Sequence, residues 1–125
     1  FIMYVKKKLA IKGRVFVSLR AGRDEYIRTT AAYSPDEDKN YIRCNGRALV
    51  DILRSIAHEM VHNKQREDGI IKPGVPVQNI GGPEEASADT NAGILIKDFT
   101  HNQGFDRIYD MCESYRVKLG KTLLS

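Results

Sequence analysis

The chain has 125 residues, of which 42% are hydrophobic and 29% charged, and its formal net charge is +4. This length fits one domain with its own core, and the composition excludes disordered, collagen-like and disulfide-stapled chains. No apolar run approaches the roughly 20 residues that span a bilayer, and the first residues lack a signal-peptide pattern. We therefore expect one cytoplasmic domain over residues 1–125, alone or as part of a longer protein, without a membrane partner. Because the basic charge is spread along the chain, nucleic acid is a disfavoured partner.

The first half of the chain is rich in strand-forming residues. Partial alternation of β-formers predicts strands over 8–12, 14–19, 26–33 and 41–44. The segment 34–40 is turn material, and Asn45 is a candidate helix cap. The two cysteines, Cys44 and Cys112, are far apart in the sequence, and we expect both to be reduced thiols.

The second half of the chain has helical periodicity. Apolar residues of 47–65 fall on one arc, whereas the opposite side carries Asp51, Ser55, His58 and His62. Proline and glycine mark 66–82 as a loop, and further helices are predicted over 83–99 and 105–119. Strands followed by helices indicate an α+β fold.

Two of the three histidines form the motif His-Glu-x-x-His at 58–62. On a helix, His58 and His62 lie one turn apart on the same face, where both imidazoles can bind one Zn²⁺. Glu59 lies to one side of that face, where it can reach a zinc-bound water. The alternative is that both are surface histidines of an amphipathic helix.

A zinc site of this kind needs a third protein ligand, for which the chain offers Asp68, His101 and Glu85. Asp68 lacks the neighbouring glycine that a metzincin-like turn requires, and His101 is far downstream. Glu85 is favoured because the face it shares with Asp89 on the predicted helix has small residues, which allow a close approach to the histidine helix. Asp89 is then placed to accept the outer N–H of a ligand imidazole.

The motif, a loop and then Glu-x-x-x-Asp together resemble the gluzincin metallopeptidases. The pattern Glu-x-x-Ala-Asp-x-x-Ala over 85–92 is similar to the small ImmA/IrrE-like zinc peptidases, although Asn91 stands where that group often has Phe. SprT-like proteases share the first motif but use a nearby histidine as third ligand. The resemblance covers 56–96 and implies a minimal zincin-like domain, with an N-terminal antiparallel sheet on an active-site helix and two further helices. We expect its substrate-binding edge strand at 41–44.

The resemblance implies a zinc-dependent peptidase that acts on a protein or peptide substrate. Zn²⁺ on His58, His62 and Glu85 would lower the pKa of its bound water to roughly 7, and Glu59 would accept the proton. Candidates for a second oxyanion donor are His101, Tyr109 and Tyr115. The alternative function is a zincin-fold binding or structural module, with or without metal, that has a protein partner in a larger assembly. A DNA-associated protease is supported only by the basic charge.

Overall fold

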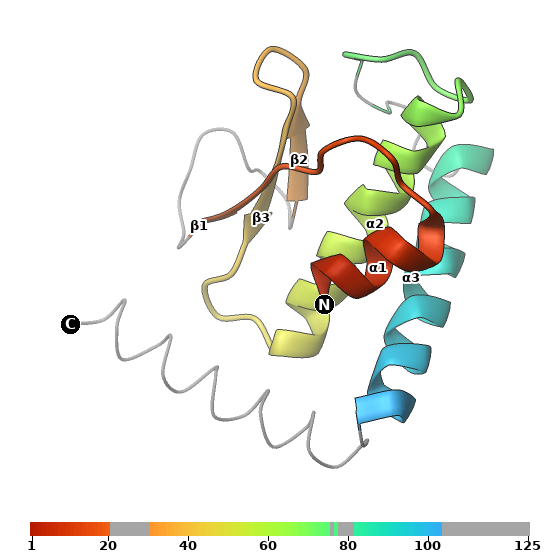
Figure 1. Ribbon diagram of the computed structural model, residues 1–125. Helices are drawn as coiled ribbons and strands as arrows, with labels where there is room; N and C mark the ends of the chain where they lie inside the picture. Colours follow the sequence, from red (N-terminus) through yellow and green to blue (C-terminus); the bar gives the residue numbers. More distant parts are fainter. Residues whose placement is uncertain (21–30, 76, 78–81, 104–125) are drawn as a thin grey trace.

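The computed structural model describes residues 1–20, 31–75, 77 and 82–103. Its elements in chain order are α1 (Ile2–Leu9), β1 (Val17–Arg20), β2 (Ala31–Ser34), β3 (Lys39–Arg43), α2 (Leu49–Glu67) and α3 (Pro83–Gln103). Figure 1 shows α2 between the sheet and α3, with α1 lying across α2. The α+β prediction is confirmed. The predicted helix over 105–119 lies outside the described residues.

The three strands form a mixed sheet in the order β1-β3-β2. β2 pairs antiparallel with β3 through a four-residue turn in the predicted 34–40 segment, but β1 pairs parallel with β3. The sheet is therefore not antiparallel throughout. The prediction of an edge strand at 41–44 is wrong because β3 is the central strand, with Tyr41 and Ile42 buried. The edge strand beside the helices is β2, at the end of the predicted strand 26–33.

The predicted strand over 8–12 is not formed, because Lys8 and Leu9 end the N-terminal helix α1 and residues 10–12 follow it without regular structure. Apolar residues Ile2, Val5 and Leu9 are spaced at helical intervals, and Val5 is completely buried. The helix ends at Leu9, and the next residue, Ala10, has a left-handed backbone (φ 54°). The N–H groups of Ala10 and Ile11 then bond to carbonyl groups of the last turn. Only the second half of the predicted strand 14–19 is a strand, β1.

A carboxylate at the end of α2 fixes the connection between α1 and β1. Glu67 Oε1 accepts a hydrogen bond from the backbone N–H of Lys12 at 2.9 Å, and Glu67 Oε2 accepts one from Gly13 at 2.9 Å. These bonds satisfy two backbone donors of an irregular segment. They also join the N-terminal part of the chain to the helix that carries the His-Glu-x-x-His motif.

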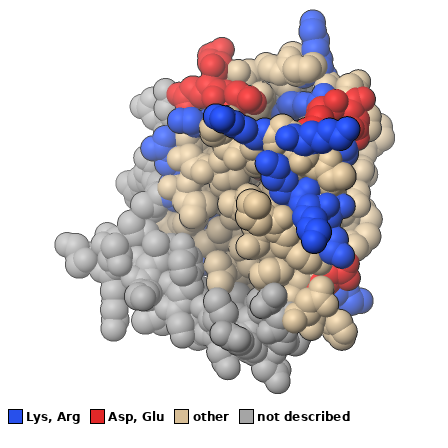
Figure 2. Space-filling model, in the orientation of Figure 1, with Lys and Arg blue, Asp and Glu red and all other residues tan. Residues whose placement is uncertain are grey.

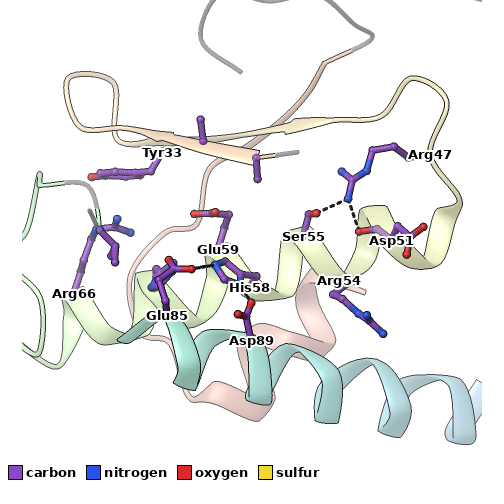
Figure 3. A pocket seen from close by; sticks show the side chains of 14 residues that line it. Tyr33, Arg47, Asp51, Arg54, Ser55, His58, Glu59, Arg66, Glu85 and Asp89 are labelled. Atoms are coloured by element: carbon purple, nitrogen blue, oxygen red, sulfur yellow. Dashed lines mark hydrogen bonds and ion pairs between the residues drawn. The ribbon is translucent and has the colours of Figure 1, made fainter. Parts of the chain in front are cut away.

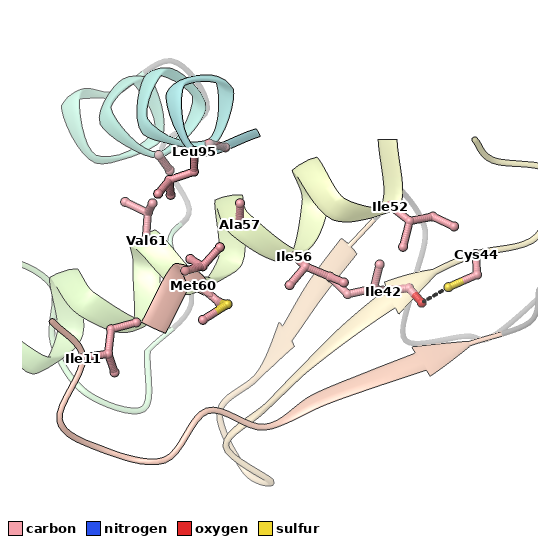
Figure 4. Close-up of a cluster of buried hydrophobic side chains, with 12 residues drawn as sticks. Ile11, Ile42, Cys44, Ile52, Ile56, Ala57, Met60, Val61 and Leu95 are labelled. Atoms are coloured by element: carbon pink, nitrogen blue, oxygen red, sulfur yellow. Dashed lines mark hydrogen bonds between the residues drawn. The ribbon is translucent and has the colours of Figure 1, made fainter. Parts of the chain in front are cut away.

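α2 begins and ends two residues later than predicted, and its cap residue is Ala48 rather than Asn45. Its apolar arc packs on the sheet, α1 and α3, as Figure 4 shows for part of the core. The core cluster comprises Val5, Ile11, Ile42, Cys44, Ile52, Ile56, Ala57, Met60, Val61, Ala88, Ala92 and Leu95. Cys44 is a free, buried thiol in this cluster, whereas Cys112 lies outside the described residues.

α3 begins at Pro83, as predicted, and runs one turn beyond the predicted end, to Gln103. No helix among the described residues is long and apolar enough to cross a bilayer. The face of the molecule in Figure 2 carries lysine and arginine side chains around α1, whose last turn contributes Lys6, Lys7 and Lys8. These charges suit the negative C-terminal end of that helix.

Candidate metal centre

The side chains of His58, His62 and Glu85 converge where α2 faces the start of α3. The Nε2 atoms of the two imidazoles are 3.1 Å apart, and His62 Nε2 lies 2.7 Å from Glu85 Oε1. His58 Nε2 lies 3.3 Å from Glu85 Oε2. All three ligand atoms lie within 4.8 Å of one another, so this group could hold a metal ion.

The outer nitrogen of each imidazole has its own hydrogen-bond partner. His58 Nδ1 lies 2.8 Å from Asp89 Oδ1, and His62 Nδ1 lies 2.8 Å from Gln65 Oε1. The Gln65 amide nitrogen donates to the backbone oxygen of Glu84 at 3.1 Å, so its oxygen is the atom that faces His62. Both partners therefore act as acceptors, and each Nδ1 carries the proton.

These hydrogen bonds determine which atoms remain to bind a cation. In the neutral imidazole the nitrogen opposite a protonated Nδ1 carries a lone pair. With Nδ1 as the donor in a neutral ring, the Nε2 atoms of His58 and His62 present lone pairs to each other and to the carboxylate of Glu85. A divalent cation satisfies such a set of three acceptors, and the outer partners fix the ring orientations as they do in known metal sites.

The close approach of α2 and α3 follows from small side chains between them. Ala57 on α2 and Ala88 and Ala92 on α3 are completely buried. With only methyl groups at these positions, the two helix backbones come near enough for the short side chain of Glu85 to reach both histidines. Glu85 also lies in the first turn of α3, where the positive end of the helix dipole stabilises a carboxylate.

Glu59 is only 8% exposed although it carries a carboxyl group. Burial raises its pKa, an effect opposed by His58, His62 and Arg66 and reinforced by Glu85. Such an environment makes the carboxylate a stronger base than an exposed one.

The centre opens into a cavity of about 640 Å³ between α2, the start of α3 and the edge strand β2. Figure 3 shows Glu59 and His58 in the middle of this cavity, with Tyr33 and Arg66 at one end and Arg47 and Arg54 toward the other. β2 contributes Ala31, Ala32 and Tyr33 to the wall. The imidazoles thus face a cleft and not the bulk surface.

The structure places the other predicted site residues elsewhere. His101 is exposed near the end of α3 and does not line the cavity. Tyr109 and Tyr115 lie outside the described residues. Asp68 caps α2, where its Oδ1 pairs with Lys64 Nζ at 3.1 Å, and it does not line the cavity.

Sequence reasoning missed several residues that support or line the site, among them Tyr33, Gln65, Arg66, Arg47 and Arg54. Gln65 and Arg66 follow His62 by three and four residues, so continued helical periodicity would have placed them on the ligand face. Gln65 ends the predicted helix, and the proline- and glycine-rich segment after it predicts a loop from Arg66 onward. Nothing in the sequence distinguishes Tyr33 from the other tyrosines.

The chain matches no protein-family model, no curated protein and no solved structure.

Proposed function

We propose that the protein is a zinc-dependent peptidase. The observation that carries the proposal is the juxtaposition of His58, His62 and Glu85 with the buried acid Glu59 in one cleft. A two-histidine, one-carboxylate set matches the donor preferences of Zn²⁺, and three protein ligands leave a coordination position open. A site that only stabilised the fold would require neither an open position nor a buried acid beside it.

Bound zinc would supply a Lewis acid that lowers the pKa of water and polarises a carbonyl group. Glu59 then has the role of general base: its carboxylate accepts a proton from the attacking water and later donates it to the departing amine nitrogen. Asp89 and Gln65 hold His58 and His62 in the required tautomer and orientation.

The edge position of β2 favours an extended peptide as substrate. β2 is an outer strand of the described sheet, and it runs along the cavity opposite the His-Glu-x-x-His helix. Edge strands bind extended peptides by main-chain pairing. A peptide laid between β2 and α2 would present its carbonyl groups to the metal centre.

The alternative is a non-catalytic module with the same fold, and one observation favours it. His58 and His62 both contact Glu85, and these contacts become ion pairs when an imidazole is protonated, so the three side chains can hold together without any metal. Such a polar cluster could serve only to hold α2 against α3.

Metal content and peptide hydrolysis distinguish the two functions. We expect about one zinc per chain and hydrolysis of a fluorogenic peptide library. Glu59→Gln should abolish hydrolysis while it retains the zinc, because the base is lost and the ligands are not. Asp98→Asn, which removes an exposed acid of α3 outside the cavity, is the matched control and should keep both properties. Zinc binding without hydrolysis by the unaltered chain would favour the non-catalytic module.

A further inference from the structure

Arg66 is a buried cation whose hydrogen-bond donors are incompletely used. The side chain lies in the last full turn of α2, lines the cavity and is only 8% exposed. Its Nε and Nη1 atoms are buried, and no described residue accepts a hydrogen bond from them. No carboxylate of the described residues forms an ion pair with it within 4.0 Å. Buried donors of a charged group cost free energy until an acceptor satisfies them.

One face of the Arg66 guanidinium is already occupied. It stacks on the ring of Tyr33 with its central carbon 3.7 Å from the ring centroid, as Figure 3 shows at one end of the cavity. The Tyr33 hydroxyl donates to Asp38 Oδ1 at 3.0 Å, which holds the ring in place. Stacking leaves the in-plane N–H groups without an acceptor, and this edge of an arginine matches the two oxygens of a carboxylate. Because Nε and Nη1 are themselves buried, a ligand reaches them only when neighbouring side chains shift.

Burial lowers the pKa of Arg66, whereas the nearby Tyr33, Glu59 and Asp38 raise it. An arginine remains protonated at neutral pH despite such effects. The cavity wall therefore carries a positive charge, and two of its N–H donors lack an acceptor.

The position of Arg66 relates this charge to the metal centre. Arg66 is four residues after His62 on one helix, so their backbones are separated by about 6 Å along the axis. An extended peptide advances about 3.3 Å per residue. A group bound by Arg66 would thus lie within about two residues of a bond held at the metal centre.

We propose that Arg66 binds a carboxylate of the substrate close to the bond that is cleaved. The identity of this ligand as part of a peptide rests on the proposed peptidase function. The carboxylate has two sources in a peptide, the C-terminal α-carboxylate and the side chain of Asp or Glu. The first source would make the enzyme a carboxypeptidase, and the second would make it selective for acidic residues.

Two pairs of acetylated peptides distinguish these sources. The first pair is acetyl-tetraalanine with a free or an amidated C-terminus, and the second is acetyl-trialanyl-glutamate amide or its glutamine counterpart. We expect the acidic member of at least one pair to bind about 10- to 100-fold more tightly, as bonds to charged groups do. Hydrolysis of the same peptides by the unaltered chain should show the same preference in kcat/KM.

Calorimetric binding is measured on Glu59→Gln protein, which should not turn the peptides over, both with zinc and without metal. The metal-free measurement is needed because a bound cation also attracts carboxylates, whereas Arg66 is present in both states. Arg66→Met should reduce the acid-to-neutral ratio to about one. Arg66→Lys, which keeps the charge without the planar donors, should lose most of the ratio and serves if the Met variant does not fold.

Arg54→Met is the matched control, because Arg54 carries the same charge on the same helix and lines the same cavity but is exposed. It should retain the acid-to-neutral ratio. The inference is overturned if the unaltered chain discriminates in neither pair, if Arg66→Met keeps the ratio, or if Arg54→Met loses it. Selective binding without hydrolysis of any peptide would refute the peptidase and leave the carboxylate site intact. Hydrolysis without selectivity would refute the carboxylate site and leave the proposed peptidase function intact.

Discussion

The outer hydrogen-bond partners of the two imidazoles are Asp89 and Gln65, and replacing either one should weaken metal binding. The loss of affinity should not be the same for the two replacements. Asp89 bonds to His58 with a side chain that is 73% exposed, so water can replace it. Its Asn variant also keeps an acceptor oxygen and loses only the charge. Partners of ligand imidazoles contribute about 10- to 100-fold to affinity or activity. Because solvent screens an exposed charge, we expect about 10-fold weaker zinc binding for Asp89→Asn.

Gln65 is buried and holds two groups at once, His62 Nδ1 and the backbone oxygen of Glu84. Gln65→Met keeps the length of the side chain but leaves the N–H of His62 without an acceptor. An unsatisfied buried donor costs about 1–3 kcal/mol, and each 1.4 kcal/mol corresponds to about tenfold in affinity. We therefore expect Gln65→Met to weaken zinc binding by about 10- to 100-fold, at least as much as Asp89→Asn.

Competition with a zinc-responsive chelating dye at neutral pH measures both affinities. Thermal unfolding of the metal-free variants is the control, because it separates loss of the ligand geometry from loss of the fold. Equal affinities for all three proteins, or a larger loss in Asp89→Asn than in Gln65→Met, would refute the argument that burial sets the size of the effect.

Three further predictions concern the ligand set, the N-terminal anchor and the helix interface. In a metal titration, Glu85→Ala should lose most of the zinc affinity, whereas His101→Ala should keep about one zinc per chain; the reverse would refute the assignment of Glu85. Hydrogen bonds from Gly13 and Lys12 lower the pKa of Glu67, so its carboxylate stabilises the folded state above its ordinary pKa of about 4.3, and this contribution is lost as pH falls through the lowered value. Urea unfolding below about pH 4.5 should accordingly show a weaker pH dependence for Glu67→Gln than for the unaltered chain, and parallel pH profiles would exclude this role. Ala92→Leu should cost about 1–3 kcal/mol in unfolding free energy by overpacking the α2–α3 interface and should also weaken zinc binding, whereas the exposed Ala86→Leu should do neither.

The sequence predicted those parts of the fold that have long, regular patterns. The apolar arc of α2 extends over five turns, and the spacing of His58 and His62 on it leaves few geometric alternatives. Pro83 and the acids after it located the start of α3, and hence Glu85. These features are local, so each can be read within one segment of chain.

The features that were missed depend on short segments or on contacts between distant ones. α1 has only eight residues, too few for a helical period to outweigh its β-branched residues. Strand order is set by pairing between segments, so the central position of β3 and the parallel alignment of β1 had no local signal. Arg66 has the composition of a surface residue, and only its stacking on Tyr33 from another element reveals a buried charge.

The contact between His62 and Glu85 joins positions that are 23 residues apart in the chain. In polymer terms it closes a loop, and the entropic cost of closure grows only with the logarithm of loop length. Doubling the length of this loop would add about 0.6 kcal/mol to that cost. The geometry of the ligands is set by the packing of α2 on α3, not by the connection between them. Insertions in that connection, which brings Val77 to the cavity wall, should therefore be tolerated while the ligand geometry stays in place.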